Sequence, residues 1–431
     1  MYNYTDYLEI YGRIMQFNKN KQEPFHRWYP FVEGYSKEFI QSIIKEIGKE
    51  NLNCLEPFSG SGTTALELQN IGNRCTSFEI NPFMYLIGKV KLDNEYKVDE
   101  TEKWFKYIIE NRNNYIIAEL NSDFTTLYQE QNKKKWNYNT EIGIAIEKLK
   151  LTIESISSDR YKDLFTVALA AILLDVSNLY RNGKCLSYKK DWKSRVISQQ
   201  DVFYKFDNKV RNELICDIRE FLDIKDAREN KSNVNNKELL YNEDSRIAID
   251  RVVENNSVDL VITSPPYLNS RDYTDTYMLE LKTLGFTQNV GEIRNLREKT
   301  LRSHVQLKWD DKTNIQNILL NETLQKLKTA SLNEKVWNTS IIDMVRLYFV
   351  DIHTIFSVLY KKVKVGGKIY FNVSNSAYFN VLINTLEICA SIAEQTGFTV
   401  IEIRKARYLK TSPQQQKIVG KLLEGVLLLE R

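Results

Sequence analysis

Short apolar runs and longer helical patterns alternate along both ends of this chain. Seven runs have the length and apolar content of buried strands, and they occupy residues 54–58, 75–78, 239–241, 258–263, 368–373, 399–403 and 424–429. Apolar residues recur at helical spacing over 39–47, 65–69, 246–254, 340–363 and 377–396. Strands alternating with helices predict an α/β fold with parallel strands. No helical pattern separates the last two strands, which predicts that they pair antiparallel.

The alternation stops after about residue 90 and resumes near residue 238. Apolar residues follow helical spacing over 101–120, 141–156 and 160–180, so this part predicts a helical insertion. The polar stretch 226–237 predicts a surface loop that leads out of the insertion.

We therefore expect three parts, at residues 1–90, 91–237 and 238–431, in agreement with a length that exceeds one small domain. Within the last part, residues 268–336 show no clear periodicity and carry several cations. Segments of this kind supply the loops that hold ligands.

Composition excludes several classes of protein without choosing a function. Hydrophobic content of 42% and charged content of 27% are ordinary for a globular protein. Five scattered cysteines without a CxxC pair, and three histidines, argue against a disulfide framework or a metal site. The N-terminus lacks a signal-peptide pattern, and the most apolar run, 167–174, is too short to cross a bilayer. We expect a cytoplasmic protein with no membrane segment and no metal.

A glycine-rich turn follows the first predicted strand. Gly60 and Gly62 separate that strand from a helix, and such a turn lets backbone N–H groups at the helix start approach a ligand. Glu79 ends the next strand, 17 residues after Gly62. An acidic residue near this spacing holds ribose hydroxyls in nucleotide-binding units. The pair predicts a ligand that contains adenosine.

A rigid turn, Thr263-Ser264-Pro265-Pro266-Tyr267, ends the strand 258–263. Each proline fixes its own φ and lacks an N–H, and the residue before it is held extended. The Ser264 hydroxyl and the Pro265 carbonyl can accept hydrogen bonds from a flat amine-bearing group, and Tyr267 offers a stacking face. A strand end capped by a Pro-Pro turn is the alternative interpretation.

Together these motifs resemble the amino-group DNA methyltransferases that use S-adenosylmethionine. The resemblance covers residues 25–90 and 238–431, and it implies a doubly wound, seven-stranded, Rossmann-like sheet with a terminal antiparallel hairpin. Phe58, Gly60 and Gly62 match the FxGxG cofactor loop of that family, Glu79 its ribose-binding acid, and Asp244 the acid near the adenine amino group. The cofactor-binding residues it implies are Trp28, Tyr29, Phe31, Glu56, Phe58, Gly60, Gly62, Thr63, Thr64, Glu79, Ile80, Asp244 and Ser245.

The aromatic segment Trp28-Tyr29-Pro30-Phe31 matches more loosely the part of that family that closes over the methionine end of the cofactor. Aromatic clusters of this kind also form hydrophobic cores, and the sequence leaves both interpretations open.

The resemblance also implies the reaction. Ser264-Pro265-Pro266-Tyr267 matches the catalytic (D/N/S)PPY motif, and its serine variant is typical of enzymes that methylate N4 of cytosine. We expect methylation of a flipped base in double-stranded DNA, by the modification enzyme of a restriction–modification system whose endonuclease is encoded separately. The alternatives are methylation of adenine N6, methylation of an RNA base, and a non-catalytic nucleic-acid-binding protein.

Cations and aromatic residues are interleaved over 181–211, a composition that suits phosphate contacts, although a solvated helical face would look the same. Members of the family usually place target recognition elsewhere in the chain, so both 91–237 and 268–336 remain candidates for reading bases. The predicted DNA-contacting residues are Lys189, Lys190, Lys193, Arg195, Arg271, Arg294, Arg297 and Arg302.

Overall fold

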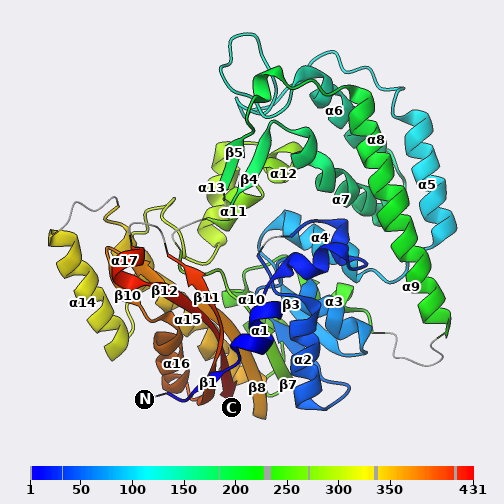
Figure 1. The fold of residues 1–431 in the computed structure, drawn as a ribbon. Helices are drawn as coiled ribbons and strands as arrows, with labels where there is room; N and C mark the ends of the chain where they lie inside the picture. Colours follow the sequence, from blue (N-terminus) through cyan, green and yellow to red (C-terminus); the bar gives the residue numbers. More distant parts are fainter. Residues whose placement is uncertain are drawn as a thin grey trace.

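A twisted sheet covered by helices on both faces forms one body of the molecule, and a helical lobe stands against one end of it (Figure 1). This computed structural model describes residues 2–31, 33–183, 185–227, 234–269, 272–333, 338–411 and 415–431. Arg271, one of the predicted DNA contacts, and residues 228–233 of the predicted loop 226–237 lie outside the described residues.

The sheet has eight strands in the order β1-β11-β12-β8-β7-β2-β3-β6. Strands β8, β7, β2, β3 and β6 run parallel, while β12 pairs antiparallel with both β8 and β11. The prediction of seven strands missed β1, which pairs with the outer edge of β11. The bounds are β1 Tyr4–Asp6, β2 Asn53–Glu56, β3 Arg74–Phe78, β6 Leu240–Tyr241, β7 Val258–Thr263, β8 Val363–Ser374, β11 Thr399–Lys410 and β12 Lys421–Glu430.

Side chains that alternate along the central strands enter two separate cores. On β7, Leu260 and Ile262 pack with the helices of one face, while Val261 packs with those of the other, as the two-residue period of a strand requires. The first face carries α1 Leu8–Ile14, α2 Lys37–Ile47, α3 Thr63–Asn70 and α4 Pro82–Leu92. The second carries α10 Ser245–Val252, α14 Ile318–Asn333, α15 Ile341–Lys362 and α16 Thr385–Gln395.

The helix predicted over 377–396 begins only at Thr385. The residues before it form a two-stranded hairpin of β9 Ser376–Tyr378 and β10 Val381–Ile383. The turn residues Phe379 and Asn380 have φ angles of 52° and 61°, which is the backbone of a tight type I′ hairpin turn. The prediction of helix at 377–384 was therefore wrong.

The predicted helical insertion forms the second lobe (Figure 1). Its elements are α5 Val98–Asn111, α6 Thr140–Glu154, α7 Asp159–Val176, β4 Leu179–Asn182, β5 Cys185–Tyr188, α8 Gln199–Lys209, a π-helical turn Val210–Ile215 and α9 Cys216–Ala227. Four short 3-10 turns occur at Phe17–Gln22, His26–Trp28, Trp192–Ser194 and Asn236–Leu239, and α17 Gln416–Val419 lies between β11 and β12.

Residues 272–299 are helical and join this lobe, although they were predicted as part of a loop. They form α11 Tyr273–Thr276, α12 Met278–Thr283 and α13 Val290–Lys299. Leu279 and Leu281 are buried in the same core as the insertion, and the hydroxyls of Tyr138 and Thr283 lie 3.1 Å apart. The 272–299 part of the candidate recognition region 268–336 thus packs with the other candidate region, 91–237. Leu301, Ile315 and the buried residues of α14 belong to the other core.

Within the described ranges, no helix combines the length and the apolar content needed to cross a membrane.

Candidate functional site

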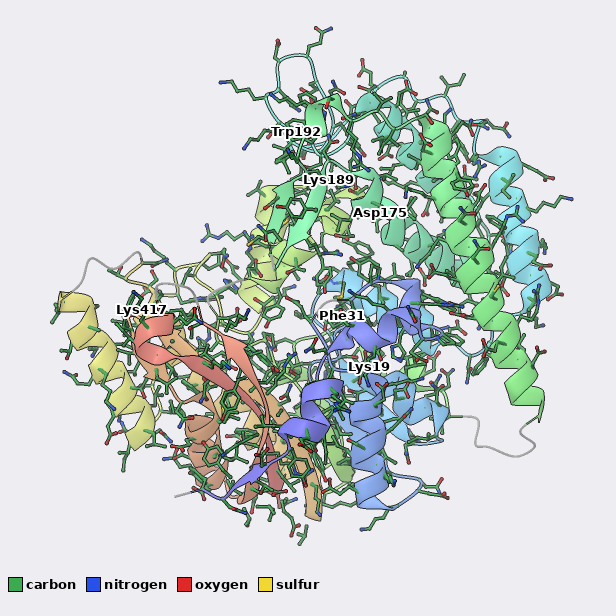
Figure 2. The ribbon with its side chains drawn as sticks, in the orientation of Figure 1. Lys19, Phe31, Asp175, Lys189, Trp192 and Lys417 are labelled. Atoms are coloured by element: carbon green, nitrogen blue, oxygen red, sulfur yellow. The ribbon has the colours of Figure 1, made fainter. Side chains whose placement is uncertain are left out.

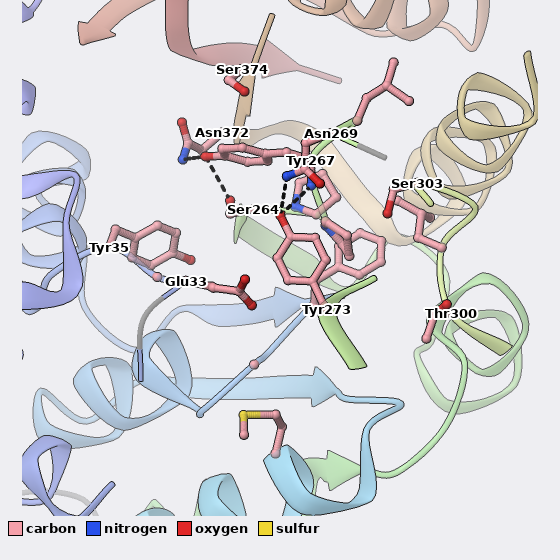
Figure 3. A pocket seen from close by; sticks show the side chains of 18 of the residues that line it. Glu33, Tyr35, Ser264, Tyr267, Asn269, Tyr273, Thr300, Ser303, Asn372 and Ser374 are labelled. Carbon is pink, nitrogen blue, oxygen red and sulfur yellow. Dashed lines mark hydrogen bonds between the residues drawn. The ribbon is translucent and has the colours of Figure 1, made fainter. Parts of the chain in front are cut away.

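A cavity of about 600 Å³ lies where the carboxyl ends of β7, β2, β3 and β6 meet (Figure 3). Sheets of this kind bind ligands at that edge, because the loops after neighbouring parallel strands converge there. The predicted site residues that line the cavity are Phe31, Phe58, Gly60, Thr63, Thr64, Glu79, Ile80, Asp244, Ser245, Ser264, Pro265, Pro266 and Tyr267.

The glycine turn needs both of its glycines. Gly60 has φ +53°, and a Cβ there would lie 3.0 Å from the ring of Phe31. Gly62 has φ +80°, and a Cβ would lie 3.0 Å from Cα of Gly88 on α4. Gly60 lines the cavity, whereas Gly62 lets the start of α3 pack closely against α4.

The carboxylate of Glu79, which directly follows β3, binds the backbone of the glycine loop. One oxygen accepts a hydrogen bond from the Gly60 amide and the other from the Asn81 amide, both at 2.8 Å. Burial raises the pKa of Glu79 to about 7, and the amide hydrogen bonds oppose that rise. Glu79 and Ile80 both line the cavity, so this acceptor group lies where a ligand hydroxyl can reach it.

Glu56 lies under the cavity and does not line it. Its carboxylate is buried and accepts hydrogen bonds from the Phe58 amide at 3.0 Å and from the hydroxyls of Thr64 at 2.9 Å and Tyr35 at 3.1 Å. It also accepts one from the Thr263 hydroxyl at 2.5 Å. Burial raises the pKa of Glu56 to about 7. This residue ties the glycine loop to the strand that ends in the proline turn.

The aromatic segment divides between core and cavity. Trp28 is fully buried and donates its indole N–H to Asp217 at 2.8 Å, and Tyr29 donates its hydroxyl to Glu280 at 2.6 Å. Neither ring lines the cavity, whereas Phe31 does. Trp28 and Tyr29 therefore occupy the junction with the helical lobe, as the core interpretation of this segment expects.

Asp244 and Ser245 begin α10 at the rim of the cavity. The Asp244 carboxylate caps the helix by accepting from the Arg246 amide at 3.0 Å, and it pairs with the Arg246 guanidinium at 2.7 Å. Arg246 also pairs with Asp351 at 2.9 Å. The charge of Asp244 is thus balanced within the protein.

The proline turn lines the same cavity as the glycine loop and follows β7, the strand beside β2. Its backbone is fixed by the prolines and by the Tyr267 amide, which donates to the hydroxyl of Tyr273 at 3.0 Å. The Ser264 hydroxyl lies 3.4 Å from the Tyr267 hydroxyl (Figure 3). Burial, followed by the charge of Glu424, raises the pKa of Tyr267 well above its ordinary value, so the phenol stays protonated.

Three further cavity residues, Asn372, Arg407 and Glu424, were not predicted. The Tyr267 hydroxyl donates to Glu424 at 2.8 Å and accepts from the Asn372 amide at 2.7 Å. A sequence signal did exist, because Asn372 and Glu424 are polar positions inside otherwise apolar strands. Such a signal marks a buried polar group without saying which partner it meets.

Two of the predicted DNA contacts, Lys189 and Arg195, bind carbonyls at the end of a helix. Lys189 donates to the carbonyls of Leu174, Asp175 and Ser177, and Arg195 donates to those of Asp175 and Ser177. Figure 2 shows Lys189 close to Asp175 at the end of α7. Cations at this position satisfy carbonyls that a helix leaves unpaired.

Two more are held in ion pairs. Arg297 pairs with Asp272 and Asp275, and Arg302 pairs with Asp351 at 2.7 Å. The predicted DNA contacts whose side chains remain exposed are Lys190, Lys193 and Arg294.

Among the residues that the structure describes, no group of three or more His, Cys, Asp or Glu side chains is placed to hold a metal ion.

Comparison with known proteins relates most of the chain to one class of enzyme, although no protein-family model matches it. The chain is 26% identical over 455 residues to Type II methyltransferase M.BsoBI of Geobacillus stearothermophilus, covering 94% of this chain and 84% of that protein. It is 26% identical over 428 residues to Type II methyltransferase M.AvaI of Nostoc sp., covering 91% and 82%. Type II methyltransferase M.MvaI of Kocuria varians is 26% identical over 352 residues, covering 74% and 69%. These relatives confirm the resemblance that the motifs carried, and the chain is a relative of the type II DNA methyltransferases.

Proposed function

We propose that this protein transfers a methyl group from S-adenosylmethionine to the exocyclic amine of a flipped base in double-stranded DNA, at N4 of cytosine. The observation that carries the proposal is that Gly60 of the glycine turn, Glu79 and the Ser264–Tyr267 turn line one cavity. The names of the relatives support a modification enzyme of a restriction–modification system.

The residues of the cavity fit an adenosine-containing cofactor. Its volume of about 600 Å³ lies within the range of small-molecule sites. Glu79 offers a carboxylate for ribose hydroxyls, and Asp244 lies at the rim with Ser245. The buried Ser59 hydroxyl, also at the cavity, has no hydrogen-bond partner among the described residues. Bound there, S-adenosylmethionine would supply a methyl group carried on a sulfonium.

The proline turn would prepare the acceptor amine. The nitrogen lone pair of such an amine is delocalised into the base ring, which makes it a poor nucleophile. Hydrogen bonds from its N–H groups to the Ser264 hydroxyl and the Pro265 carbonyl would localise that lone pair. Most of the acceleration would come from orienting the two reactants. The amine is inaccessible inside a duplex, so the base must be flipped out, and the Tyr267 ring would stack on it.

The serine in the turn favours cytosine N4 over adenine N6, which remains the second candidate, and an RNA base is the third. The test is incubation with methyl-labelled S-adenosylmethionine and either DNA or RNA, followed by nucleoside digestion and mass spectrometry. We expect N4-methylcytosine in DNA. Finding N6-methyladenine would change the assigned target base from cytosine to adenine and leave the rest of the proposal in place. Label in RNA only, or none in DNA of varied sequence, would refute the proposal.

Replacing the serine of the turn separates chemistry from cofactor binding. Ser264→Ala should lower the rate of methyl transfer on the order of 10²-fold, because it removes a hydrogen bond to the reacting amine, and should leave cofactor affinity unchanged. Ser257→Ala, at the opposite end of β7, is the matched control. Loss of cofactor binding in Ser264→Ala would show that the two halves of the cavity are assigned wrongly.

A further inference from the structure

The hydroxyl of Tyr267 is fixed by side chains from other strands of the sheet, of which Figure 3 shows Asn372. It donates to Glu424 on β12 at 2.8 Å and accepts from Asn372 on β8 at 2.7 Å. The Asn372 amide lies 3.3 Å from the same Glu424 oxygen. The other Glu424 oxygen accepts from Arg407 on β11 at 2.6 Å. We call Asn372, Arg407 and Glu424 the tyrosine clamp.

The fold alone gives little reason for a buried ion pair at this position. The Glu424 side chain is 2% exposed and its ion-pair partner Arg407 is 26% exposed. Desolvating an ion pair offsets most of its attraction, so apolar residues of similar size often serve stability equally well. The neighbours on β12, Leu423 and Val426, are such apolar residues. A buried charge at this position therefore points to a role in the site.

The hydrogen bonds at Tyr267 indicate that this role is to hold its side chain in place. The Tyr267 backbone is tied to Tyr273 through its amide, and the far end of the side chain is tied through its hydroxyl. Holding both ends fixes the position and the long axis of the ring before a base arrives. The Ser264 hydroxyl lies 3.4 Å from the same Tyr267 hydroxyl, so the clamp also restricts the serine. Ordering these groups in advance removes an entropy loss from the bound state.

We propose that Asn372, Arg407 and Glu424 are positioning residues for methyl transfer, which hold Tyr267, and through it Ser264, in the arrangement that receives the base. The inference rests on the proposed function. It assigns to the Tyr267 hydroxyl an anchoring role and leaves the face of the ring for the base.

A double-mutant cycle tests the clamp. Glu424→Gln removes the charge that Arg407 pairs with, and Tyr267→Phe removes the anchored hydroxyl. Each single variant should lower the single-turnover rate of methyl transfer about 10- to 100-fold, the effect of a modest misplacement of reacting groups. Cofactor affinity should stay within about twofold, since this wall is not the cofactor loop. The double variant should be no slower than the slower single variant, because both changes act on one linkage. Glu424→Gln keeps only an uncharged acceptor and loses the ion pair with Arg407, and Tyr267→Phe has no hydroxyl to donate.

The opposite results are equally clear. Independent effects that multiply in the double variant, or a Glu424→Gln enzyme with the full rate, would overturn the clamp. If Glu424→Gln does not fold, the partly exposed Arg407→Met replaces it in the same cycle, with Lys405→Met on the same strand as control. Wild-type activity on DNA is measured first, so failure of the proposed function is distinguished from failure of the clamp.

Discussion

Burial disfavours the ionised form of the Glu79 carboxylate, which is the form that would accept a ligand hydroxyl. Its two oxygens are each held by a backbone amide, yet burial still raises its pKa to about 7. A ribose hydroxyl would donate to the ionised form, so cofactor binding and deprotonation of Glu79 are linked.

Affinity for S-adenosylmethionine should therefore rise with pH through about 7 and level off above it. Below pH 7 the affinity should fall by up to about tenfold per pH unit, because binding must first release a proton. Glu79→Gln should bind more weakly and lose this pH dependence, as measured by equilibrium dialysis between pH 6 and 8. An unchanged pH profile in Glu79→Gln would assign the titration to another group.

Folding stability should respond to pH with the opposite sign. The ordinary pKa of Glu79 is 4.5 and the folded value is about 7, so the folded state binds the proton more tightly. The stability that this contributes is present below pH 4.5 and is lost as pH rises through 7. Glu56 has the same raised pKa away from the cavity, so part of this loss should persist in Glu79→Gln.

At the scale of elements, neighbouring cations in one stretch of the insertion lobe have different contacts. Lys190 and Lys193 are exposed, while Lys189 binds three carbonyls at the end of α7. We expect the exposed side chains to be the ones that contact DNA phosphates.

Lys190→Ala combined with Lys193→Ala should weaken DNA binding uniformly across sequences. The slope of log affinity against log salt should become shallower by about 0.9 for each phosphate that the variant no longer neutralises, as measured by fluorescence anisotropy. Lys189→Ala should instead lower the free energy of unfolding by about 1 kcal/mol, because the carbonyls at the end of α7 lose their cap. An unchanged salt slope in the double variant would place the phosphate-binding cations elsewhere.

The elements that could be predicted are those with a local signal. Val258–Thr263 is an apolar run, interrupted by Asp259 and bounded by turn residues, and the structure has a strand there. Residues 381–383 are equally apolar, but an apolar run this short suits helix or strand, and the left-handed turn at Phe379 decides for a hairpin. The strand β1 has only three residues and no pattern of its own.

The site residues differ in the same way: those in contiguous motifs could be predicted from the sequence, and those brought together by folding could not. The glycine loop and the proline turn are contiguous motifs, so the sequence showed both halves of the cavity. Glu424 meets Tyr267 across 157 residues, and Trp28 meets Asp217 across 189. No local pattern specifies such partners, and folding alone brings them together.

At the scale of the molecule, a buried charged cluster joins the two lobes. Arg181 of β4 donates to Glu280 of α12 at 2.6 Å and to the hydroxyl of Tyr29 at 2.7 Å. The side chains of Arg181 and Glu280 are 11% and 1% exposed. The cluster holds the helical lobe against the segment that leads into the cavity at Phe31.

Glu280→Gln should destabilise the protein by about 3–5 kcal/mol, because it leaves Arg181 buried without a counter-charge. The exposed pair Arg294–Glu298 on α13, at 69% and 49% exposure, gives the control, since Glu298→Gln should cost less than about 0.5 kcal/mol. Urea unfolding of both variants measures the difference. Equal losses would mean that the buried pair and its contacts with Tyr29 do not stabilise the junction.

The continuity of the cavity has a consequence for inhibition. Gly60, Glu79 and the Ser264–Tyr267 turn line the same space of about 600 Å³. One small molecule could therefore occupy both the part beside Glu79 and the part beside the proline turn. An adenosine analogue linked to a pyrimidine would be a bisubstrate ligand, whose second half binds at a high effective concentration once the first is held. The geometry of this pocket would then set the length of the linker.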